Sequence, residues 1–260
     1  MRISGTEFVR IHQMEYSPSA SENSSQCELP FLRVSVDGLP DSLDAIIATG
    51  DLQGFTVASG TRAGLGEAVA FEIARLQREG LLPPPDRTAV VLTGDLHAGA
   101  GEEDVLPVWR AFRNVGRWVA GVAGNHDRLV PPVPRDVNAH LLDGSTVALD
   151  GIRVGGLSGI VSATAGLWHR RERDYINRLS LLMEQQCDLL VLHDGPNVAG
   201  TDLPGWPSIR HLLESATPVL MIRGHDHWPQ PMAELANGTQ VLNVEGRVVV
   251  LQRRLGGTAG

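Results

Sequence analysis

Residues 89–97 read AVVLTGDLH, an apolar run of strand length followed directly by Gly94 and Asp95. An uninterrupted apolar run of this kind is typical of a β-strand that is buried on both faces of its sheet. Glycine permits a sharp turn and a close backbone approach at the end of such a strand. The stretch therefore predicts a central strand whose carboxyl end presents the Asp95 side chain.

The same arrangement recurs four more times along the chain. The other apolar runs are Ala45–Thr49, Val119–Ala123, Leu189–Leu192 and Val219–Ile222. The polar segments that follow them are Asp51-Leu52-Gln53, Asn125-His126-Asp127, His193-Asp194 and His225-Asp226-His227. Open α/β sheets bind their ligands at the carboxyl ends of the strands. We therefore expect the five polar segments to converge on one site.

The rest of the chain alternates further strands with helices. Further apolar runs predict strands at Val147–Leu149, Ile152–Leu157, Val241–Val244 and Val248–Leu251. Apolar residues at helical spacing predict helices from Leu65 to a stop at Gly80, over 105–112, over Arg171–Gln186 and from Pro207 onward. This alternation indicates an α/β fold. The last strands have no helices between them, which indicates either a mixed sheet or two packed sheets.

The chain is long enough for one large core, since 42% of its 260 residues are hydrophobic. We divide it into an N-terminal extension over residues 1–43 packed on the main domain, the main domain over residues 44–255, and a tail over residues 256–260. The serine-rich segment Ser17–Cys27 is predicted to be a loop that follows a short N-terminal strand.

Charge and composition narrow the possible partners. The formal net charge is −8, which disfavours long nucleic acids and anionic membrane surfaces as partners. The sequence shows no apolar signal region and no stretch of membrane-spanning length. Cys27 and Cys187 match no zinc-binding or redox spacing. We expect a soluble cytoplasmic protein whose oligomeric state the sequence leaves open.

The residue types at the strand ends indicate the kind of site. Carboxylates, an amide oxygen and imidazoles, without thiolates, suit manganese, iron or zinc. A carboxylate shared between two such ions holds them roughly 3.5–4 Å apart, which is the spacing of two-metal hydrolases. The sequence therefore predicts two divalent metal ions, with Mn²⁺ as the first choice and iron or Zn²⁺ as alternatives.

The ordered set of strand-end motifs resembles the calcineurin-like metallophosphoesterase superfamily. That family carries Asp-x-His, Gly-Asp, Gly-Asn-His-Asp/Glu, a lone His and Gly-His-x-His after successive strands. The match runs from Asp51 to His227 and covers most of the chain. Each motif alone has little specificity, but the five in this order are highly specific. The resemblance implies a four-layer α/β/β/α sandwich and hydrolysis of phosphoric esters.

The resemblance also implies a role for each matching residue. The first ion would be held by Asp51, Gln53, Asp95 and His227, and the second by Asp95, Asn125, His193 and His225. Asp95 would bridge the two ions, and water activated between them would attack phosphorus. His126 would protonate the leaving oxygen. Arg128 and Asn125 are expected to contact the phosphate group of the substrate.

This sequence departs from the family in two places. Gln53 stands where the family usually has a histidine, and an amide oxygen is a weaker ligand than an imidazole. His97 is an alternative candidate for the missing imidazole. The protein Ser/Thr phosphatase branch places an Asp and an Arg where this chain has Ala98 and Gly99, so membership in that branch is disfavoured. Asp127 is the candidate that could replace this orienting carboxylate beside His126.

We therefore predict a metal-dependent phosphoesterase that acts on a small phosphodiester, nucleotide or phosphomonoester. The alternatives are a protein Ser/Thr phosphatase-like enzyme, a nuclease, and a scaffold that binds metal without catalysis. The retained His126 argues against the scaffold, and only one ligand position is altered. Trp206 and Trp228 follow ligand-bearing turns and could stack on a base, although ordinary packing is the simpler interpretation.

Overall fold

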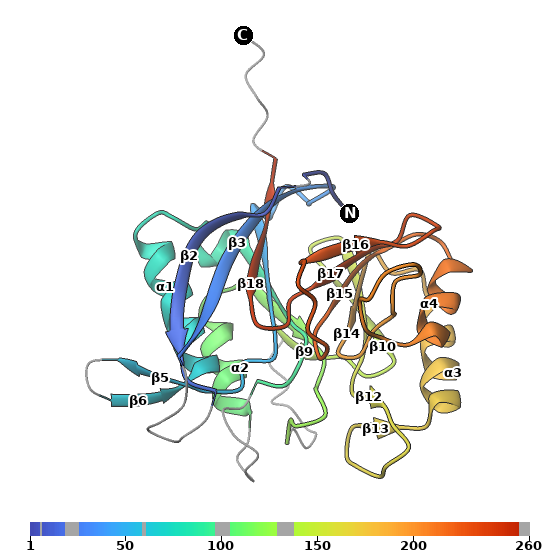
Figure 1. Cartoon of the computed structure of the whole chain (residues 1–260). Helices are drawn as coiled ribbons and strands as arrows, with labels where there is room; N and C mark the ends of the chain where they lie inside the picture. The colour runs from blue at the N-terminus through green and yellow to red at the C-terminus, as the bar shows by residue number, and fades with distance from the viewer. Residues whose placement is uncertain (6, 19–25, 59–60, 97–104, 129–137, 255–260) are drawn as a thin grey trace.

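The computed structural model describes residues 1–5, 7–18, 26–58, 61–96, 105–128 and 138–254, and these form two β-sheets flanked by helices (Figure 1). The first sheet has the strand order β1-β3-β18-β4-β7-β8-β9, with β2 paired to β3. Its strands are β1 (Arg2–Ile3), β2 (Val9–Tyr16), β3 (Cys27–Asp37), β4 (Ala45–Thr49), β7 (Thr88–Leu92), β8 (Trp118–Gly121), β9 (Ala139–Leu141) and β18 (Val248–Arg253). The strands β4, β7, β8 and β9 run parallel to one another, as their registers show.

The second sheet has the strand order β10-β11-β14-β15-β17-β16. Its strands are β10 (Ser145–Leu149), β11 (Ile152–Leu157), β14 (Leu189–Leu192), β15 (Leu220–Arg223), β16 (Met232–Glu234) and β17 (Gln240–Asn243). The four central strands β11, β14, β15 and β17 are parallel, and β10 and β16 are antiparallel at the two edges. Two short ribbons pair β5 (Phe55–Ala58) with β6 (Thr61–Gly64) and β12 (Ile160–Val161) with β13 (His169–Arg170).

In the part of the chain that the structure describes, four α-helices pack on the sheets, two on each. They are α1 (Leu65–Arg78), α2 (Leu106–Arg113), α3 (Glu172–Met183) and α4 (Pro207–Glu214), and a 3₁₀ turn covers Pro85–Arg87. Helix α1 ends just before Gly80, whose φ of 73° is the left-handed conformation that commonly closes a helix. No helix in the described part of the chain is long and apolar enough to cross a membrane.

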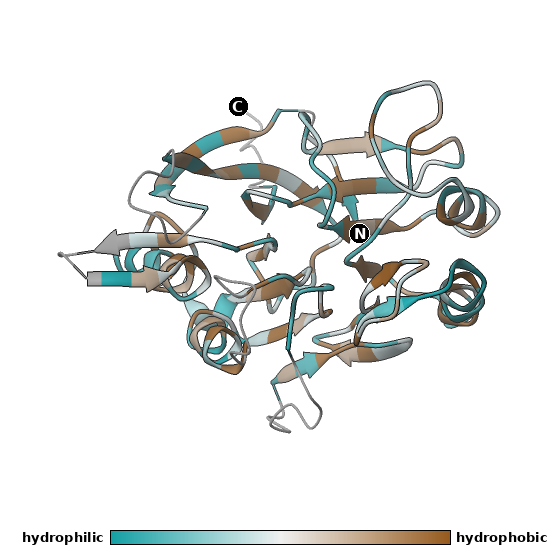
Figure 2. Ribbon diagram, turned by 60° about the horizontal axis from the view of Figure 1, so that its bottom comes forward, coloured by the Kyte–Doolittle hydropathy of each residue, from teal (hydrophilic) through white to brown (hydrophobic). Residues whose placement is uncertain are grey.

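Three hydrophobic cores lie between these layers, and the alternation of side chains along each strand produces them. Ile46 and Ala48 of β4 belong to the core between the two sheets, whereas Ala45 and Ile47 face α1 and α2. In the same way, β14 and β15 send alternate residues to the core between the sheets and to the core beneath α3 and α4. Figure 2 shows hydrophobic residues concentrated in the strands of both sheets, while the helices also carry hydrophilic residues.

The structure confirms the α/β class, with two sheets and helices packed on them in the described part of the chain. The two possibilities left open for the last strands both occur, because two sheets pack together and each sheet is mixed. The predicted strand at Val219–Ile222 lies one residue further on and ends with the buried Arg223.

The first 43 residues contribute more structure than one short strand. They form β1, β2 and the 11-residue β3, and β3 pairs in parallel with β18 inside the first sheet. The alternating burial of β3 explains why a search for continuous apolar runs overlooks it. The predicted loop at Ser17–Cys27 falls largely on residues 19–25, which lie outside the described part of the chain, and Cys27 already belongs to β3.

Candidate metal centre

The carboxyl ends of the parallel strands of both sheets meet at one site. The loops after β4, β7 and β8 come from the first sheet, and the loops after β14 and β15 come from the second. Hydrogen bonds join them: for example, the His193 ring nitrogen Nδ1 lies 2.7 Å from the Thr93 carbonyl, and the His225 backbone N–H donates to Asp51 Oδ2 at 3.0 Å. The site is therefore built across the junction of the two sheets.

Four of the predicted ligands form a compact group. Among the described residues, Asp95, His193 and His225 each offer one ligand atom, and these atoms all lie within 4.8 Å of one another. The Asn125 Oδ1 atom lies 3.1 Å from His193 Nε2, and the rings of His193 and His225 have centroids 5.0 Å apart. These four residues are the ones that the family resemblance assigns to the second metal ion.

The His193 ring is held in the orientation that metal-ligating histidines adopt. Nδ1 donates to the Thr93 carbonyl, which leaves Nε2 facing Asp95 Oδ2 at 3.4 Å and Asn125 Oδ1. The ring is fully buried. Burial lowers the pKa of His193, but the carboxylates of Asp95 and Asp51 outweigh it and raise the pKa to about 10. A positive charge is therefore strongly favoured at this point of the site.

Asp51 and Gln53 are also close to Asp95. Gln53 Nε2 donates to Asp95 Oδ2 at 3.1 Å, so the amide contacts the same carboxylate oxygen that faces His193. Burial raises the pKa of Asp51 to about 7, and repulsion from Asp95 adds to the shift. A nearby cation would favour the charged form of Asp51, because burial and the Asp95 carboxylate both disfavour that form.

Three of the proposed ligands have strained backbones. Five described non-glycine residues have positive φ, and they include Asp51 at 52°, Asp95 at 53° and His225 at 71°. The left-handed conformation costs an L-residue roughly 1–2 kcal/mol. Strain of this kind clusters at functional sites, where the surrounding structure compensates for it. Nothing in the sequence pattern predicts these dihedral angles.

Two glycines of the motifs are required by the space around the carboxylates. A Cβ atom on Gly124 would collide with Asp95 Oδ1, and one on Gly224 would collide with Asp51 Oδ2. Both added atoms would lie far inside van der Waals contact. A glycine at a strand end permits close backbone approach, and here the Asp95 and Asp51 carboxylates occupy the space that a side chain would fill.

The Asp127 carboxylate, which was expected to orient the His126 ring, binds backbone N–H groups instead. Its Oδ2 accepts hydrogen bonds from the backbone N–H groups of Asp95 at 2.9 Å and Gly124 at 2.8 Å, and its Oδ1 accepts from Leu96 at 2.9 Å. In the described part of the chain, no hydrogen bond of this carboxylate reaches the His126 ring. Asp127 is buried and ties the loop after β8 to the loop after β7.

His126 and Arg128 are both exposed in the loop that follows β8. The His126 backbone N–H donates to Asp95 Oδ1 at 2.9 Å, which fixes the residue beside the central carboxylate while its side chain reaches solvent. Arg128 is exposed two residues further on. His97, the alternative candidate for the missing imidazole, lies outside the described residues, as do Ala98 and Gly99.

His227 stands apart from the compact group and has a carboxylate partner that the sequence analysis overlooked. Its ring is 71% exposed, and its Nδ1 lies 2.7 Å from Glu245 Oε2. Glu245 follows the parallel strand β17 and is therefore at the same sheet edge as the other ligands. The rule that polar residues follow buried strands applies to it as well, because the run Val241–Val244 directly precedes it.

The two tryptophans that follow the ligand-bearing turns, Trp206 and Trp228, pack into the protein. Trp228 is fully buried, its Nε1 donates to the Pro204 carbonyl at 2.9 Å, and the Arg223 guanidinium lies over its ring. Trp206 is half-buried and packs against the core beneath α3 and α4. Trp228 therefore has the packing role that the sequence analysis considered the simpler interpretation.

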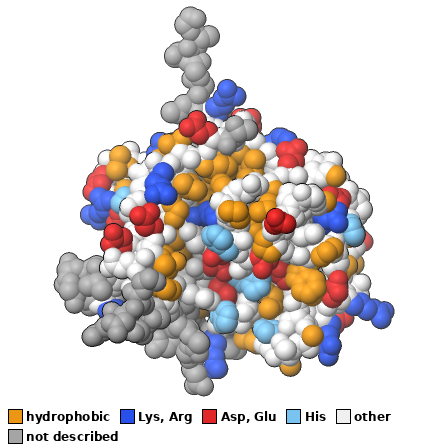
Figure 3. Space-filling model, in the orientation of Figure 1, with side chains coloured by type: hydrophobic (Ala, Val, Ile, Leu, Met, Phe, Trp, Pro, Cys, Tyr) orange, Lys and Arg blue, Asp and Glu red, His pale blue; other side chains and the backbone are white. Residues whose placement is uncertain are grey.

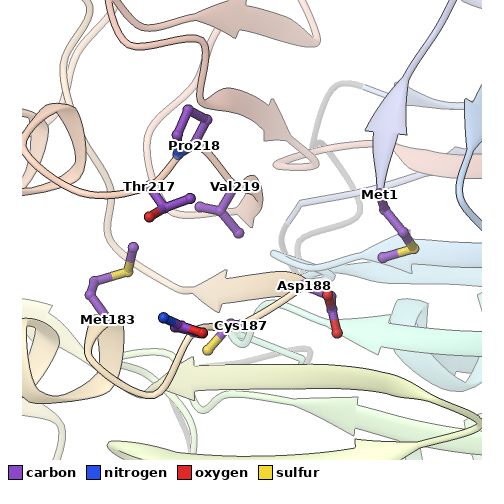
Figure 4. Close-up of a pocket in the computed structure, with 8 residues that line it drawn as sticks. Met1, Met183, Cys187, Asp188, Thr217, Pro218 and Val219 are labelled. Atoms are coloured by element: carbon purple, nitrogen blue, oxygen red, sulfur yellow. The ribbon is translucent and has the colours of Figure 1, made fainter.

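A cavity of about 380 Å³ lies at the opposite ends of the strands from the candidate site (Figure 4). Among its lining residues, Asp188 directly precedes β14 and Val219 directly precedes β15. The proposed ligands His193 and His225 follow these same strands. The cavity is therefore separate from the candidate metal centre.

The residues at the strand ends fit divalent metal ions. The donors are carboxylate, amide and imidazole groups, burial disfavours the charged form of Asp51 unless a cation is near, and the His193 ring is oriented by its outer hydrogen bond. Figure 3 shows histidine and acidic side chains gathered near the middle of the face that it presents.

Comparisons with known proteins agree with this site. Residues 45–229 match the sequence profile of the calcineurin-like phosphoesterases, and the members of that family are metal-dependent hydrolases of phosphoric esters. Among solved structures, TT1561 of Thermus thermophilus has the same fold, with 17% identity, a TM-score of 0.58 and coverage of 77% of this chain and 88% of that one.

A second solved structure, AQ665 of Aquifex aeolicus, described as a protein of unknown function, is 14% identical over 79% of this chain and 95% of that one. Its TM-score of 0.37 is too low to support an argument. No curated protein matches the chain significantly. The profile covers well over half of the sequence and includes all five strand-end motifs, so the chain belongs to the calcineurin-like phosphoesterase family.

Proposed function

We propose that this phosphoesterase uses two divalent metal ions to hydrolyse a small phosphodiester, nucleotide or phosphomonoester. The observation that carries the proposal is the position of the Asp95 carboxylate. Its Oδ2 lies 3.1 Å from Gln53 Nε2 and 3.4 Å from His193 Nε2, and these two residues belong to different predicted metal sites. A carboxylate between two ligand sets is the arrangement that a shared, bridging ligand requires.

The two sets would be unequal. Asp95, Asn125, His193 and His225 would hold one ion, and they are already gathered within a few ångströms of one another. Asp51, Gln53, Asp95 and His227 would hold the other. These ligands of the first ion include one neutral amide, that of Gln53, and one exposed imidazole, that of His227. When bound, divalent metal ions supply a Lewis acid that neutralises charge on the phosphate and activates water.

The residues of the chain itself would position the ester and move the proton. The exposed His126 side chain lies on a backbone that is anchored to Asp95, and from there it would donate a proton to the leaving oxygen. Asn125 and the exposed Arg128 would contact the phosphate oxygens. The net charge of −8 favours a small substrate over a long nucleic acid.

A substrate screen tests this proposal. Purified protein, stripped of metal and reloaded with Mn²⁺, Zn²⁺ or Fe²⁺, is assayed against phosphomonoesters, bis-aryl phosphodiesters, cyclic nucleotides, dinucleoside polyphosphates, phosphopeptides and single-stranded DNA. We expect hydrolysis of at least one class of small ester, with Mn²⁺ the most effective ion. Preferential hydrolysis of DNA or phosphopeptide, or no hydrolysis of any ester with any of the three ions, would contradict the proposal.

A further inference from the structure

Glu245 lies beside the candidate metal centre, and no motif of the family resemblance includes it. Its Oε2 atom is 2.7 Å from Nδ1 of His227, which is proposed to ligate the first metal ion. We infer that Glu245 is a positioning residue, which accepts the Nδ1–H of His227 and so presents Nε2 to that ion. The inference rests on the proposed dinuclear function and extends it to a residue outside the ligand set.

The backbone of Glu245 is fixed from two directions. It forms a parallel β-bridge with Gly50, directly before Asp51, and its N–H donates to Asn243 Oδ1 at 2.9 Å. Asn243 is fully buried, and its Nδ2 donates to the Asp226 carbonyl at 2.8 Å, within the loop that carries His227. Glu245 is thus tied both to the loop of Asp51 and to the loop of His227.

His227 needs such a partner more than the other histidines of the site. Its ring is 71% exposed, whereas the His193 ring is fully buried and its Nδ1 is already bonded to the Thr93 carbonyl. The Glu245 side chain is only 23% exposed, so the less exposed carboxylate holds the more exposed imidazole. A carboxylate on the outer nitrogen fixes the tautomer of a metal-ligating histidine and increases the basicity of the inner nitrogen.

The partner also compensates for the amide at position 53. A neutral glutamine oxygen donates less to a transition metal than an imidazole nitrogen does. A carboxylate behind His227 strengthens the one imidazole that remains in the first set. We therefore expect the affinity of the first ion to depend on Glu245, and the affinity of the second ion to be independent of it.

Calorimetric titration of metal-free protein with Mn²⁺ tests the inference without reference to activity. Loss of an outer-shell partner typically lowers metal affinity by roughly 10–100-fold. We expect Glu245→Ala to weaken one of the two binding events by about that factor and to leave the other unchanged. Glu245→Gln keeps an acceptor oxygen without the charge and should fall between wild type and Glu245→Ala. Glu234→Gln, which alters an exposed ion pair with Arg2, is the matched control.

A double-mutant cycle identifies the route of the effect. In a His227→Ala background, Glu245→Ala should cause no further loss of affinity, because the residue through which it acts is gone. In ¹⁵N-labelled metal-free protein, NMR of the His227 ring should show the Nδ1–H tautomer in wild type and a mixture in Glu245→Ala. The melting temperatures of metal-free wild type and Glu245→Gln should agree.

Three results would overturn the inference. These are unchanged binding of both ions by Glu245→Ala, a full effect of Glu245→Ala in the His227→Ala background, and an unchanged His227 tautomer. A wild-type protein that binds fewer than two ions would instead contradict the proposed dinuclear function. The failure of each proposal is therefore recognised separately.

Discussion

Asp95 is the residue on which the contacts of the site converge. One carboxylate oxygen accepts the His126 backbone N–H, and the other faces Gln53 and His193. Its backbone is left-handed, with φ at 53°, and the residue is 3% exposed. These contacts hold the residue in an orientation in which Oδ1 and Oδ2 contact different neighbours.

Asp95→Asn should be the most damaging single change of a ligand. Asparagine tolerates the left-handed backbone, so the loop should keep its shape while the bridging charge is lost. We expect both ions to bind more weakly and turnover to fall by more than the roughly 10–100-fold typical of an outer-shell change. Metal content and turnover are measured on the same sample. A variant with both metals and a near-normal rate would show that Asp95 does not bridge.

His126→Ala should affect substrates according to their leaving groups. General-acid catalysis contributes roughly 10²–10⁴-fold, and it matters most when the leaving oxygen needs a proton. The loss of rate should therefore be much larger for an alkyl phosphate ester than for a nitrophenyl ester. Comparing kcat/KM for the two esters on wild type and variant checks this. Equal losses on both would mean that His126 has a positional or structural role.

Gln53 is the residue at which this chain departs from its family, and its amide lies 3.1 Å from Asp95 Oδ2. Rotation of the amide exchanges its oxygen and nitrogen, so Oε1 can take the same place and ligate a metal. Gln53→Ala should lower the binding affinity of one ion on the order of 10-fold, or about 1.4 kcal/mol. Gln53→His should raise the binding affinity of the same ion. Both changes are measured by calorimetric titration with Mn²⁺. If Gln53→Ala binds both ions as wild type does, Gln53 is not a ligand, and His97 or a water becomes the candidate for that coordination position.

At the scale of the elements, the site depends on loops that brace one another. The Asp127 carboxylate accepts three backbone N–H groups from the loops after β7 and β8. The Trp168 ring then donates to the Asp127 carbonyl at 3.0 Å. This buried side chain therefore braces the loop of Asp95 against the loop of Asn125, together with the hydrogen bond from the His126 backbone N–H to Asp95.

Asp127→Asn should destabilise the protein and loosen the site. An amide offers one acceptor oxygen to three donors and places its own N–H₂ against the backbone, which leaves buried donors unsatisfied at a cost of about 1–3 kcal/mol. Urea unfolding of metal-free protein measures this loss. Asp44→Asn, which breaks a more exposed pair with Arg87, is the control and should cost less. Equal stabilities of Asp127→Asn and wild type would contradict the bracing role.

Continuous burial explains which elements the sequence predicts well. The strands β4, β7, β11 and β14 are apolar along most of their length because helices or a second sheet cover both of their faces. β2 and β3 are half-buried and alternate, and β9, β12, β13 and β16 have only two or three residues, so neither group leaves a continuous apolar run.

The site shows the same division. The strand-end rule brings Asp95, Asn125, His193 and His225 together from sequence alone, because parallel strands share one carboxyl edge. The left-handed backbones of the ligands and the pairing of His227 with Glu245 depend on tertiary contacts. The position of Asp127 likewise depends on donors 31 and 32 residues away, which no local pattern encodes.

At the scale of the whole molecule, the site lies across the two sheets. Asp51, Asp95 and Asn125 come from the first sheet, and His193 and His225 come from the second. Ions held by both sets of ligands would therefore join the two halves of the sandwich. Binding to the folded state alone stabilises it by about 2.7 kcal/mol when the free ligand is at 100 times Kd.

Removal of metal tests the central claim most directly. Protein stripped by exhaustive chelation and shown by elemental analysis to be metal-free is assayed on an ester that the loaded protein hydrolyses, and Mn²⁺ is then titrated back. We predict no hydrolysis without metal, because the ligands must be filled to activate water, and full recovery as the bound metal approaches two ions per chain. Hydrolysis by the metal-free protein, or full activity with a single bound ion, would contradict the two-metal account.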